Sequence, residues 1–354
     1  MDFEVERDDL RHTRVHDRRL SPLQEGDVRL HVDRFALTSN NITYGVYGEV
    51  MQYWNFFPAS EPAWGRIPVW GFADVVESRC ADVAEGVRVY GYLPMSTGFI
   101  VTPGRVDERG FSDVVEHRRA MARTYNRYMF VAADPMYESA REDHQMLLWP
   151  LFYTSFLIDD VLADADFFDA KSIVISSASS KTAIVAAYLL HGRGIEVVGL
   201  TSRRNQPFVE NLGCYSKVIT YDQLDTLGDR TAVYVDIAGN PTVTAAVHRH
   251  YAAQLQYSMV VGGTHWEQTS EVRTELVGPK PHMFFAPAQI TKRNAEWGAG
   301  VLEQRVGESW AQLVPWASEW VEFHYAVGPE AVEGVYRDLL DGRVDPRVGY
   351  VCAV

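Results

Sequence analysis

The sequence predicts an α/β protein in which a strand-rich domain is followed by a domain with a doubly wound parallel sheet. Its 354 residues are enough for about two domains. Residues 27–38 alternate apolar and polar side chains, which is typical of a half-buried strand. Residues 149–295 instead alternate short apolar strands with helical stretches, which indicates parallel strands covered by helices on both faces.

The strand-rich part extends to about residue 148. Within residues 27–38, Val28, Leu30 and Val32 fall on one face, and we expect that face to be buried. Further short strands bounded by turn residues are predicted at residues 71–78 and 86–94.

The parallel-sheet part begins with a strand at residues 170–176, followed by a helix rich in Ala and Leu. A helix at residues 205–213 ends at Gly213, which is a suitable C-cap. After this part, residues 296–354 add a long helical stretch, a strand, a helix and a last strand. The remaining apolar strands of the sheet are predicted at residues 195–201, 217–221, 231–239 and 257–264.

The composition disfavours several classes of function. Lys and Arg number 33 and Asp and Glu 47, a net charge of −14, which repels nucleic-acid phosphates and anionic lipid. The cysteines, Cys80, Cys214 and Cys352, form no C-x-x-C pair, as expected in a reducing compartment. The first residues are charged throughout and no run approaches 18 apolar residues, so we expect a cytoplasmic protein without a membrane span.

A turn of small polar residues follows the first strand of the parallel-sheet part. It reads ISSASSKTA and puts Ser176, Ser179 and Thr182 at the spacing of glycines in a G-x-x-G-x-x-G turn. Such a turn holds a pyrophosphate at the N-terminus of the following helix. An ordinary strand–helix turn is the alternative. The candidate phosphate-binding residues are Ser176, Ser177, Ala178, Ser179, Ser180, Lys181 and Thr182.

The second strand ends in GLTSRRN, with Ser202, Arg203 and Arg204 where a dinucleotide fold meets the adenosine ribose. A carboxylate there binds the 2′-hydroxyl of NADH, whereas arginine accommodates the 2′-phosphate of NADPH. The sequence therefore favours NADPH, with a solvated charged loop as the alternative. Later strand ends carry small residues that allow close approach of ribose and nicotinamide, although ordinary turns explain them too: Gly239, Gly262, Gly263 and Thr264.

With these motifs in place, the chain resembles a medium-chain dehydrogenase/reductase over nearly its whole length. The similar stretches are WGFADVVES…GVRVYGYLP, SIVISSASSKTAIVAAYLL and LGCYSKVITY. The resemblance implies a GroES-like domain at residues 1–148 and 296–354, and a Rossmann domain at residues 149–295. In zinc-free quinone and enoyl reductases of this family, a tyrosine at the position of Tyr221 contacts the 2′-phosphate of NADPH.

A narrower resemblance is to the bacterial family of unknown function DUF2855. It rests on WPLFYTSFLIDD (149–160), MVVGGTHW (259–266) and FFAPAQITKR (284–293).

The chain departs from the zinc-dependent members of the larger family. Asn40 and Asn41 stand where a cysteine ligand would lie, and Trp70-Gly71-Phe72-Ala73 stands where Gly-His-Glu would lie. Without thiolate or imidazole ligands, zinc has no place from which to polarise a substrate oxygen. We therefore expect no metal, which favours the zinc-free reductases.

The resemblance implies NADPH-dependent reduction of an activated C=C bond or a quinone, with the nicotinamide as hydride donor. A tyrosine hydroxyl in the loop SNNITYGVYGEV then donates to the substrate carbonyl, and Tyr44 and Tyr47 are both candidates. Asn40 and Asn41 are candidate donors toward the ribose or nicotinamide, and Tyr53 is an outside candidate. Core packing is the alternative for each tyrosine.

Two other functions stay open at this point. One is carbonyl reduction without a metal, in which a tyrosine or Thr264 polarises the carbonyl. The other is a catalytically idle NADPH-binding sensor or partner subunit, because a fold does not by itself fix a function. By analogy with the family, we expect a homodimer that pairs through the edge strand of the Rossmann sheet.

Overall fold

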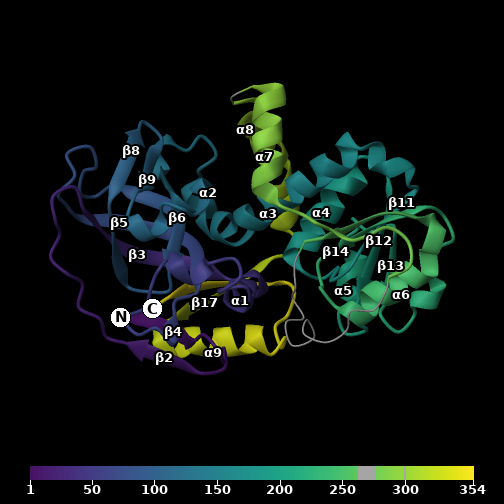
Figure 1. Cartoon of the computed structure of the whole chain (residues 1–354), viewed down its shortest axis with the longest axis horizontal. Helices are drawn as coiled ribbons and strands as arrows, with labels where there is room; N and C mark the ends of the chain where they lie inside the picture. Colours follow the sequence, from purple (N-terminus) through teal and green to yellow (C-terminus); the bar gives the residue numbers. More distant parts are fainter. Residues whose placement is uncertain (262–275, 299) are drawn as a thin grey trace. The chain divides into compact units, whose positions relative to one another are not determined.

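The chain folds into two compact units. The first comprises Met1–Trp149 and Val321–Val354, and the second comprises Pro150–Trp320 (Figure 1). The computed structural model describes residues 1–261, 276–298 and 300–354.

A nine-stranded sheet forms the centre of the first unit. Its strand order is β17-β18-β3-β5-β6-β10-β9-β8, with β7 paired to β3, and only the pair β17–β18 is parallel among the described pairs. Its strands are β3 (Val28–Leu37), β5 (Pro68–Ser78), β6 (Arg88–Pro94), β7 (Gly98–Val101), β8 (Pro103–Asp107), β9 (Gly110–Asp113), β10 (Arg127–Phe130), β17 (Glu322–Val327) and β18 (Val348–Ala353). A second sheet has the order β2-β1-β4 and contains β1 (Asp2–Glu6), β2 (Thr13–His16) and β4 (Trp64–Gly65).

The alternating pattern of residues 27–38 forms β3, as predicted. Val28, Leu30 and Val32 are buried, whereas His31 between them is exposed. The helices of this unit are α1 (Ser39–Val46), α2 (Arg123–Asn126) and α9 (Pro329–Leu340), with short 3-10 turns at Tyr53–Asn55, Glu116–Arg118, Val131–Ala133 and Ser139–Arg141.

Helix α3 (Glu142–Asp164) is continuous across the boundary between the units, with Pro150 inside it. The helical stretch Ser139–Asp164 is long and apolar enough to cross a membrane by length and composition, but 67% of its most apolar window is buried inside the protein. Such burial is typical of a core helix.

The second unit contains the parallel sheet that the sequence predicts. Its order is β13-β12-β11-β14-β15-β16 and every pair is parallel. In chain order this is 3-2-1-4-5-6, the arrangement of a Rossmann domain. The strands are β11 (Ser172–Ile175), β12 (Glu196–Thr201), β13 (Lys217–Thr220), β14 (Ala232–Asp236), β15 (Leu255–Val260) and β16 (His282–Met283). The helices are α4 (Lys181–Gly192), α5 (Gln206–Asn211), α6 (Pro241–Tyr251), α7 (Ala286–Trp297) and α8 (Val301–Ala317).

Both faces of this sheet are buried, which explains why its strands are apolar without alternation. Ile173 and Ile175 of β11 belong to one buried cluster, whereas Val174 between them belongs to another. The two clusters contain side chains of α4 and of α6, respectively.

The second boundary between the units differs from the expected one. Residues 296–320, which we expect in the first domain, belong to the second unit. Aromatic contacts hold α8 and the turn after it there: Trp310 on Phe152, Trp316 on Tyr188 with ring centroids 4.5 Å apart, and Trp320 on Phe208. These contacts join residues far apart in the chain, so local periodicity does not reveal them.

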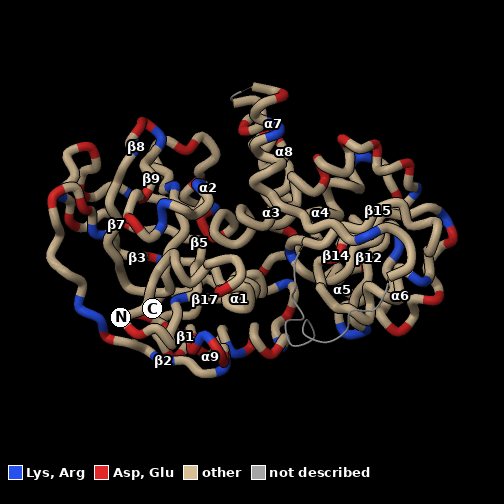
Figure 2. Tube along the Cα trace, viewed as in Figure 1, with Lys and Arg blue, Asp and Glu red and all other residues tan. Residues whose placement is uncertain are grey.

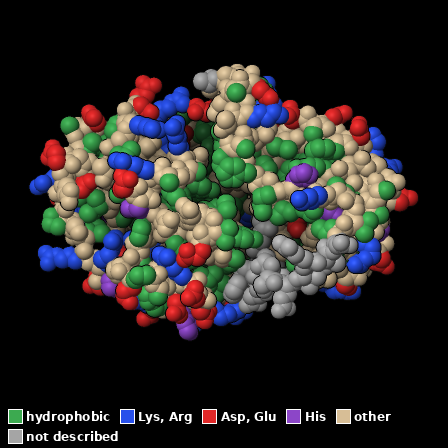
Figure 3. Space-filling view, in the orientation of Figure 1, with side chains coloured by type: hydrophobic (Ala, Val, Ile, Leu, Met, Phe, Trp, Pro, Cys, Tyr) green, Lys and Arg blue, Asp and Glu red, His purple; other side chains and the backbone are tan. Residues whose placement is uncertain are grey.

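Charged side chains of both signs are interspersed along the chain (Figure 2). The face drawn in Figure 3 likewise carries acidic and basic side chains close together on its described surface. On this face the acidic side chains are therefore interspersed with basic ones.

Candidate functional site

The candidate phosphate turn lies where the strand order of the second unit reverses. It follows β11, which pairs with β12 on one side and β14 on the other. Ligands of open α/β sheets bind outside the carboxyl ends of the strands at such a point. The turn leads directly into α4, whose N-cap is Ser180.

Ser176 differs from the role that the sequence analysis gives it. Its side chain is fully buried, and Oγ donates to Oδ1 of Asp236 at 2.7 Å. The same oxygen accepts the N–H groups of Ile237 and Ala238, both at 2.9 Å. A hydroxyl enclosed in this way has no proton left for a phosphate, so Ser176 joins β11 to the end of β14 instead.

Asp236 is the centre of this buried arrangement, and the sequence analysis missed its importance. Oδ1 also accepts the N–H of Gly239 at 3.0 Å, and Oδ2 accepts the hydroxyl of Thr244 at 2.7 Å. Gly239 has a φ of +64°, a conformation that favours glycine. An acid at the end of an apolar strand, with Gly three residues later, is the signal that was available.

Tyr221 lies beside the turn. Its hydroxyl oxygen accepts the backbone N–H of Ser177 at 2.9 Å, and burial raises the pKa of Tyr221 to about 12. Ser177 has a φ of +53°, in the left-handed region that non-glycine residues seldom adopt. The turn is thus held in an uncommon conformation next to a protonated phenol.

Close packing brings the turn against β12. The N–H of Ala178 donates to the carbonyl of Leu200 at 2.9 Å, and its carbonyl accepts the hydroxyl of Tyr215 at 2.9 Å. A Cβ atom on Gly199 would lie 2.9 Å from that of Ala178, so glycine is needed at position 199.

Ser179 and Ser180 begin the helix. Ser179 Oγ accepts Nδ2 of Asn205 at 2.9 Å, which ties the turn to the loop after β12. Ser180 Oγ accepts the N–H of Ala183 at 3.3 Å, as an N-cap does. Lys181 and Thr182 follow in the first turn of α4, and both are half-buried. Asn205 is a further residue of this region that the sequence analysis missed.

The end of β12 carries the predicted basic residues at the surface. Ser202, Arg203 and Arg204 are all exposed. Arg203 pairs with Asp222, and its Nε lies 2.8 Å from Oδ2 of that carboxylate. Its side chain is 74% exposed, so this ion pair is accessible to solvent. Gly262, Gly263 and Thr264, the last candidates for this site, lie outside the described residues.

Helix α1 of the first unit carries the candidate substrate residues. Asn41 closes a capping box: its Oδ1 accepts the N–H of Thr38 at 2.8 Å, while Nδ2 donates to the carbonyl of Pro68 at 2.9 Å. It is also buried, and its two amide atoms are already occupied. These contacts give Asn41 a structural role, and its role as a donor to ribose or nicotinamide stays a prediction.

Asn40 and Tyr44 form a pair one turn apart on α1. Asn40 Nδ2 donates to the hydroxyl oxygen of Tyr44 at 2.9 Å, which leaves the hydroxyl proton of Tyr44 for another acceptor. Tyr44 is buried against Tyr53 and Tyr92, with ring centroids 4.7 and 5.6 Å away. Tyr47 follows α1 directly and is half-buried. Tyr44 is thus a tyrosine whose hydroxyl is held by an amide on the same helix.

Buried polar atoms surround Tyr44. Burial raises the pKa of Tyr44 well above its ordinary value and that of Tyr53 to about 12. Within the described part of the chain, Nε1 of Trp70 and the hydroxyl of Tyr92 are buried with no hydrogen-bond partner. Such orphaned groups suit a place that a polar ligand or water completes.

No set of three or more His, Cys, Asp or Glu side chains able to hold a metal ion is found among residues 1–261, 276–298 and 300–354. Asn40 and Asn41 belong to α1, and Trp70 belongs to β5.

A family model described as "Protein of unknown function (DUF2855)" matches residues 35–345. No curated protein matches the sequence.

Several solved structures share the fold over nearly the whole chain. CurA from Vibrio vulnificus, in complex with NADPH, has a TM-score of 0.60 at 12% identity, with 97% of this chain and 94% of that one covered. Quinone oxidoreductase from Coxiella burnetii has a TM-score of 0.52 at 12% identity, with coverage of 100% and 98%. Haloferax mediterranei glucose dehydrogenase, with NADP, Zn and gluconolactone, has a TM-score of 0.54 at 11% identity, with coverage of 100% and 99%.

At these identities the likeness is one of fold. The predicted fold class, a GroES-like β domain with a Rossmann doubly wound parallel sheet, is confirmed.

Proposed function

The chain belongs to the DUF2855 family, and we propose that it is an NADPH-dependent oxidoreductase that works without zinc. The observation that carries the proposal is the turn after β11, where Tyr221, Asn205 and the first turn of α4 converge at the switch point of a 3-2-1-4-5-6 sheet. The reaction we propose is reduction of an activated C=C bond or of a quinone.

The residues of the turn fit a pyrophosphate. A helix leaves its first N–H groups without an intrahelical acceptor. In the contacts described for the Ser180 side chain, Oγ accepts one such group, the N–H of Ala183. Lys181 adds a positive charge at the same helix end, and Ser179 adds a hydroxyl. The missing Cβ of Gly199 lets the turn lie close to β12, which leaves its outer side for the ligand.

The residues after β12 and β13 fit the 2′-phosphate of NADPH. Ser202 and Arg204 are exposed there, and Arg203 holds its guanidinium next to Asp222. Because guanidinium pairs with phosphate in a bidentate manner, a 2′-phosphate competes with Asp222 for Arg203. Tyr221, whose hydroxyl proton is not used by Ser177 N–H, supplies a further donor. CurA, which shares the fold, was crystallised with NADPH.

When bound, the nicotinamide supplies the hydride, and the protein positions and polarises the acceptor. We assign the polarising role to Tyr44. The amide of Asn40 donates to its oxygen, which strengthens the hydroxyl as a donor to a substrate carbonyl. Since burial raises the pKa of Tyr44, it keeps its proton and acts as a hydrogen-bond donor to the developing enolate oxygen.

The second candidate is an NADPH-binding protein without turnover. The burial of Tyr44 favours it, because a hydroxyl enclosed by Tyr53 and Tyr92 has limited access to a substrate. Carbonyl reduction without a metal uses the same donor and differs only in the acceptor.

NADPH titration by protein fluorescence, followed by an NADPH-consumption assay with quinones, enones, enoyl thioesters and ketones, tests these functions. Saturable binding with turnover of an enone or quinone is the expected result. Turnover of ketones alone supports the carbonyl reductase, binding without turnover supports the idle protein, and no binding excludes all three.

We also propose a homodimer that pairs through β16, one of the two edge strands of the described parallel sheet in the second unit. Met283 in β16 and Phe285 after it are 75% and 54% exposed, which is unusual for large apolar side chains next to an open edge. Light scattering after size exclusion is expected to give twice the mass of the 40.0 kDa chain, and Met283→Lys is expected to give monomers.

A further inference from the structure

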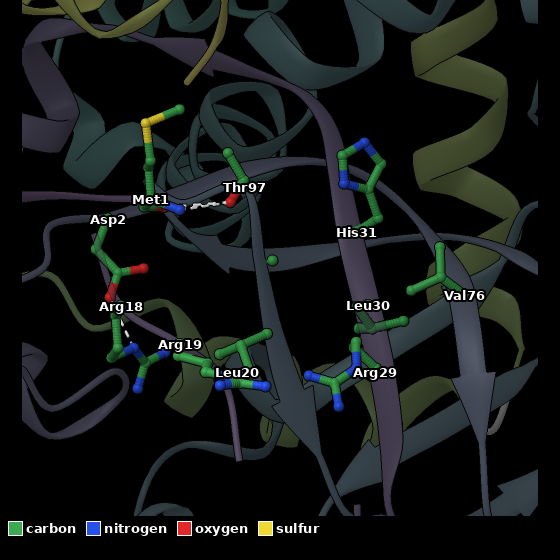
Figure 4. Close-up of a pocket in the computed structure, with 11 residues that line it drawn as sticks. Met1, Asp2, Arg18, Arg19, Leu20, Arg29, Leu30, His31, Val76 and Thr97 are labelled. Atoms are coloured by element: carbon green, nitrogen blue, oxygen red, sulfur yellow. Dashed lines mark hydrogen bonds and ion pairs between the residues drawn. The ribbon is translucent and has the colours of Figure 1, made fainter. Parts of the chain in front are cut away.

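A pocket lies within the first unit, and none of its lining residues belongs to α1. Its walls come from the start of β1, the first residues of β3, the end of β5 and the start of β7, together with the segment around Arg19 (Figure 4). Its volume of about 350 Å³ falls in the range of small-molecule sites, roughly 300–1,000 Å³. Nothing in the proposed reaction uses it.

The lining of this pocket is basic although the chain as a whole is acidic. It holds three arginines, Arg18, Arg19 and Arg29, and a single carboxylate, Asp2. In Figure 4 the three guanidinium groups lie along the same side of the pocket. Local positive charge on a chain of net charge −14 is a feature that general solubility does not explain.

The charge of Asp2 is offset by its neighbours. Its Oδ2 lies 2.8 Å from Nε of Arg18 and 3.4 Å from Nη1 of Arg66, and its side chain is buried. Two guanidinium groups therefore face one carboxylate here. Because Arg18 and Arg66 neutralise its charge, Asp2 repels an anion in the pocket only weakly.

The other two arginines differ in how they are held. Arg29 pairs with Glu77 through Nε at 2.8 Å and donates from Nη2 to the carbonyl of Ser21 at 3.2 Å, so its position is fixed. Arg19 is exposed, and no carboxylate of the described residues lies within ion-pair distance of it. One fixed and one uncommitted guanidinium can together hold an oxyanion from two directions.

The rest of the wall is apolar. Leu20 is half-buried and Val76 is 50% exposed, so both offer apolar surface to a ligand, whereas Leu30 is fully buried. Inorganic ions gain nothing from such side chains, whereas a short hydrocarbon does. Charge and apolar surface are thus next to each other.

We propose that this pocket binds a small organic anion, with a carboxylate or phosphate head between Arg19 and Arg29 and an apolar body against Leu20 and Val76. Guanidinium groups suit both oxyanions, because each presents two oxygens to the donor fork. The proposal does not depend on the NADPH-dependent reaction.

Isothermal titration of the full chain at low ionic strength with hexyl phosphate, hexanoate and inorganic phosphate tests it. Hexyl phosphate or hexanoate is expected to bind at least about fivefold more tightly than inorganic phosphate, because only the first two reach the apolar wall. Arg19→Ala is expected to weaken this binding at least about fivefold, since it removes the one uncommitted guanidinium.

Arg119→Ala is the matched control. Arg119 is an exposed arginine of the same unit, paired with Glu116 outside the pocket, so its removal changes the net charge equally. Val76→Asp is a second variant, which adds a negative charge at the rim without removing any pairing and is expected to weaken binding as well. The proposal is overturned if neither organic anion binds, if inorganic phosphate binds equally well, or if Arg119→Ala weakens binding as much as Arg19→Ala.

Discussion

Ser176 donates its hydroxyl proton to Asp236 at 2.7 Å, and this contact joins two strand ends that are 60 residues apart in the chain. The serine occupies the position of the first glycine in the predicted phosphate turn. Instead of leaving room for a ligand, it satisfies a buried carboxylate and two backbone N–H groups. Any cofactor contact of this turn therefore comes from the residues that follow Ser176.

Replacing this hydroxyl is predicted to destabilise the second unit. Ser176→Ala removes a donor to the buried Asp236 carboxylate and the hydroxyl oxygen that accepts the N–H groups of Ile237 and Ala238. The expected loss is about 1–3 kcal/mol in the free energy of unfolding, measured by urea denaturation. Ser202→Ala, at an exposed serine, serves as the control and is expected to stay within about 0.5 kcal/mol of the wild type. Equal stability of both variants would contradict the structural role of Ser176.

Tyr44 is predicted to be the hydroxyl that acts on the substrate. Tyr44→Phe removes the donor that Asn40 orients and is expected to lower kcat about 10²–10³-fold, as loss of one oxyanion donor does. Tyr47→Phe, which leaves the contact between Asn40 and Tyr44 in place, is expected to keep kcat near the wild-type value. Steady-state kinetics on the best acceptor from the panel provide the measurement. A normal rate for Tyr44→Phe would remove this tyrosine from the mechanism.

The surface after β12 is predicted to decide between the two pyridine nucleotides. The double variant Arg203→Ala/Arg204→Ala is expected to weaken NADPH binding about 10–100-fold, because hydrogen bonds to charged groups contribute about 1.5–3 kcal/mol. NADH binding is expected to stay unchanged, since NADH lacks the 2′-phosphate.

Asp222→Asn is expected to change the affinity for NADPH in the opposite direction to the arginine double variant. It frees Arg203 from its carboxylate partner and is expected to tighten NADPH binding while leaving NADH unaffected. Fluorescence titration with both nucleotides measures these effects. If the double variant loses both nucleotides equally, the arginines do not recognise the 2′-phosphate.

The hydrophobic periodicity of the sequence was sufficient to predict the fold, because the burial of each strand dictates that periodicity. The alternation around Leu30 gives a strand with one buried face, and the continuous apolar run of β11 gives a strand buried on both. The exposed position of Arg203 and Arg204 at the end of β12 also agrees with the strand pattern. Each of these features depends on neighbours within a few residues.

The parts that the sequence analysis missed depend on distant partners. Ser176 meets Asp236, and α8 packs by Trp310 on Phe152, through contacts that only the folded chain creates. Asn41 is different, because its capping role is local. A Thr at position 38 with an amide three residues later is a helix-start signal that the sequence itself contains.

Alkaline conditions are predicted to destabilise the first unit through its tyrosine cluster. Burial raises the pKa of Tyr53 to about 12 and holds those of Tyr44, Tyr92 and Tyr125 above their ordinary value as well. Unfolded tyrosines ionise near pH 10, so above that pH the unfolded state binds fewer protons than the folded one. The free energy of unfolding therefore falls as pH rises, by up to about 1.4 kcal/mol per pH unit for each such tyrosine, until the folded residues ionise.

Urea denaturation at a series of values from about pH 8 to about pH 11 measures this slope. Tyr92→Phe is the matched variant, because the hydroxyl that it removes has no partner among the described residues. It is expected to leave stability at about pH 8 nearly unchanged and to reduce the alkaline slope by one tyrosine's share. An unfolding free energy that stays constant up to about pH 11 would mean that these hydroxyls are not buried in solution.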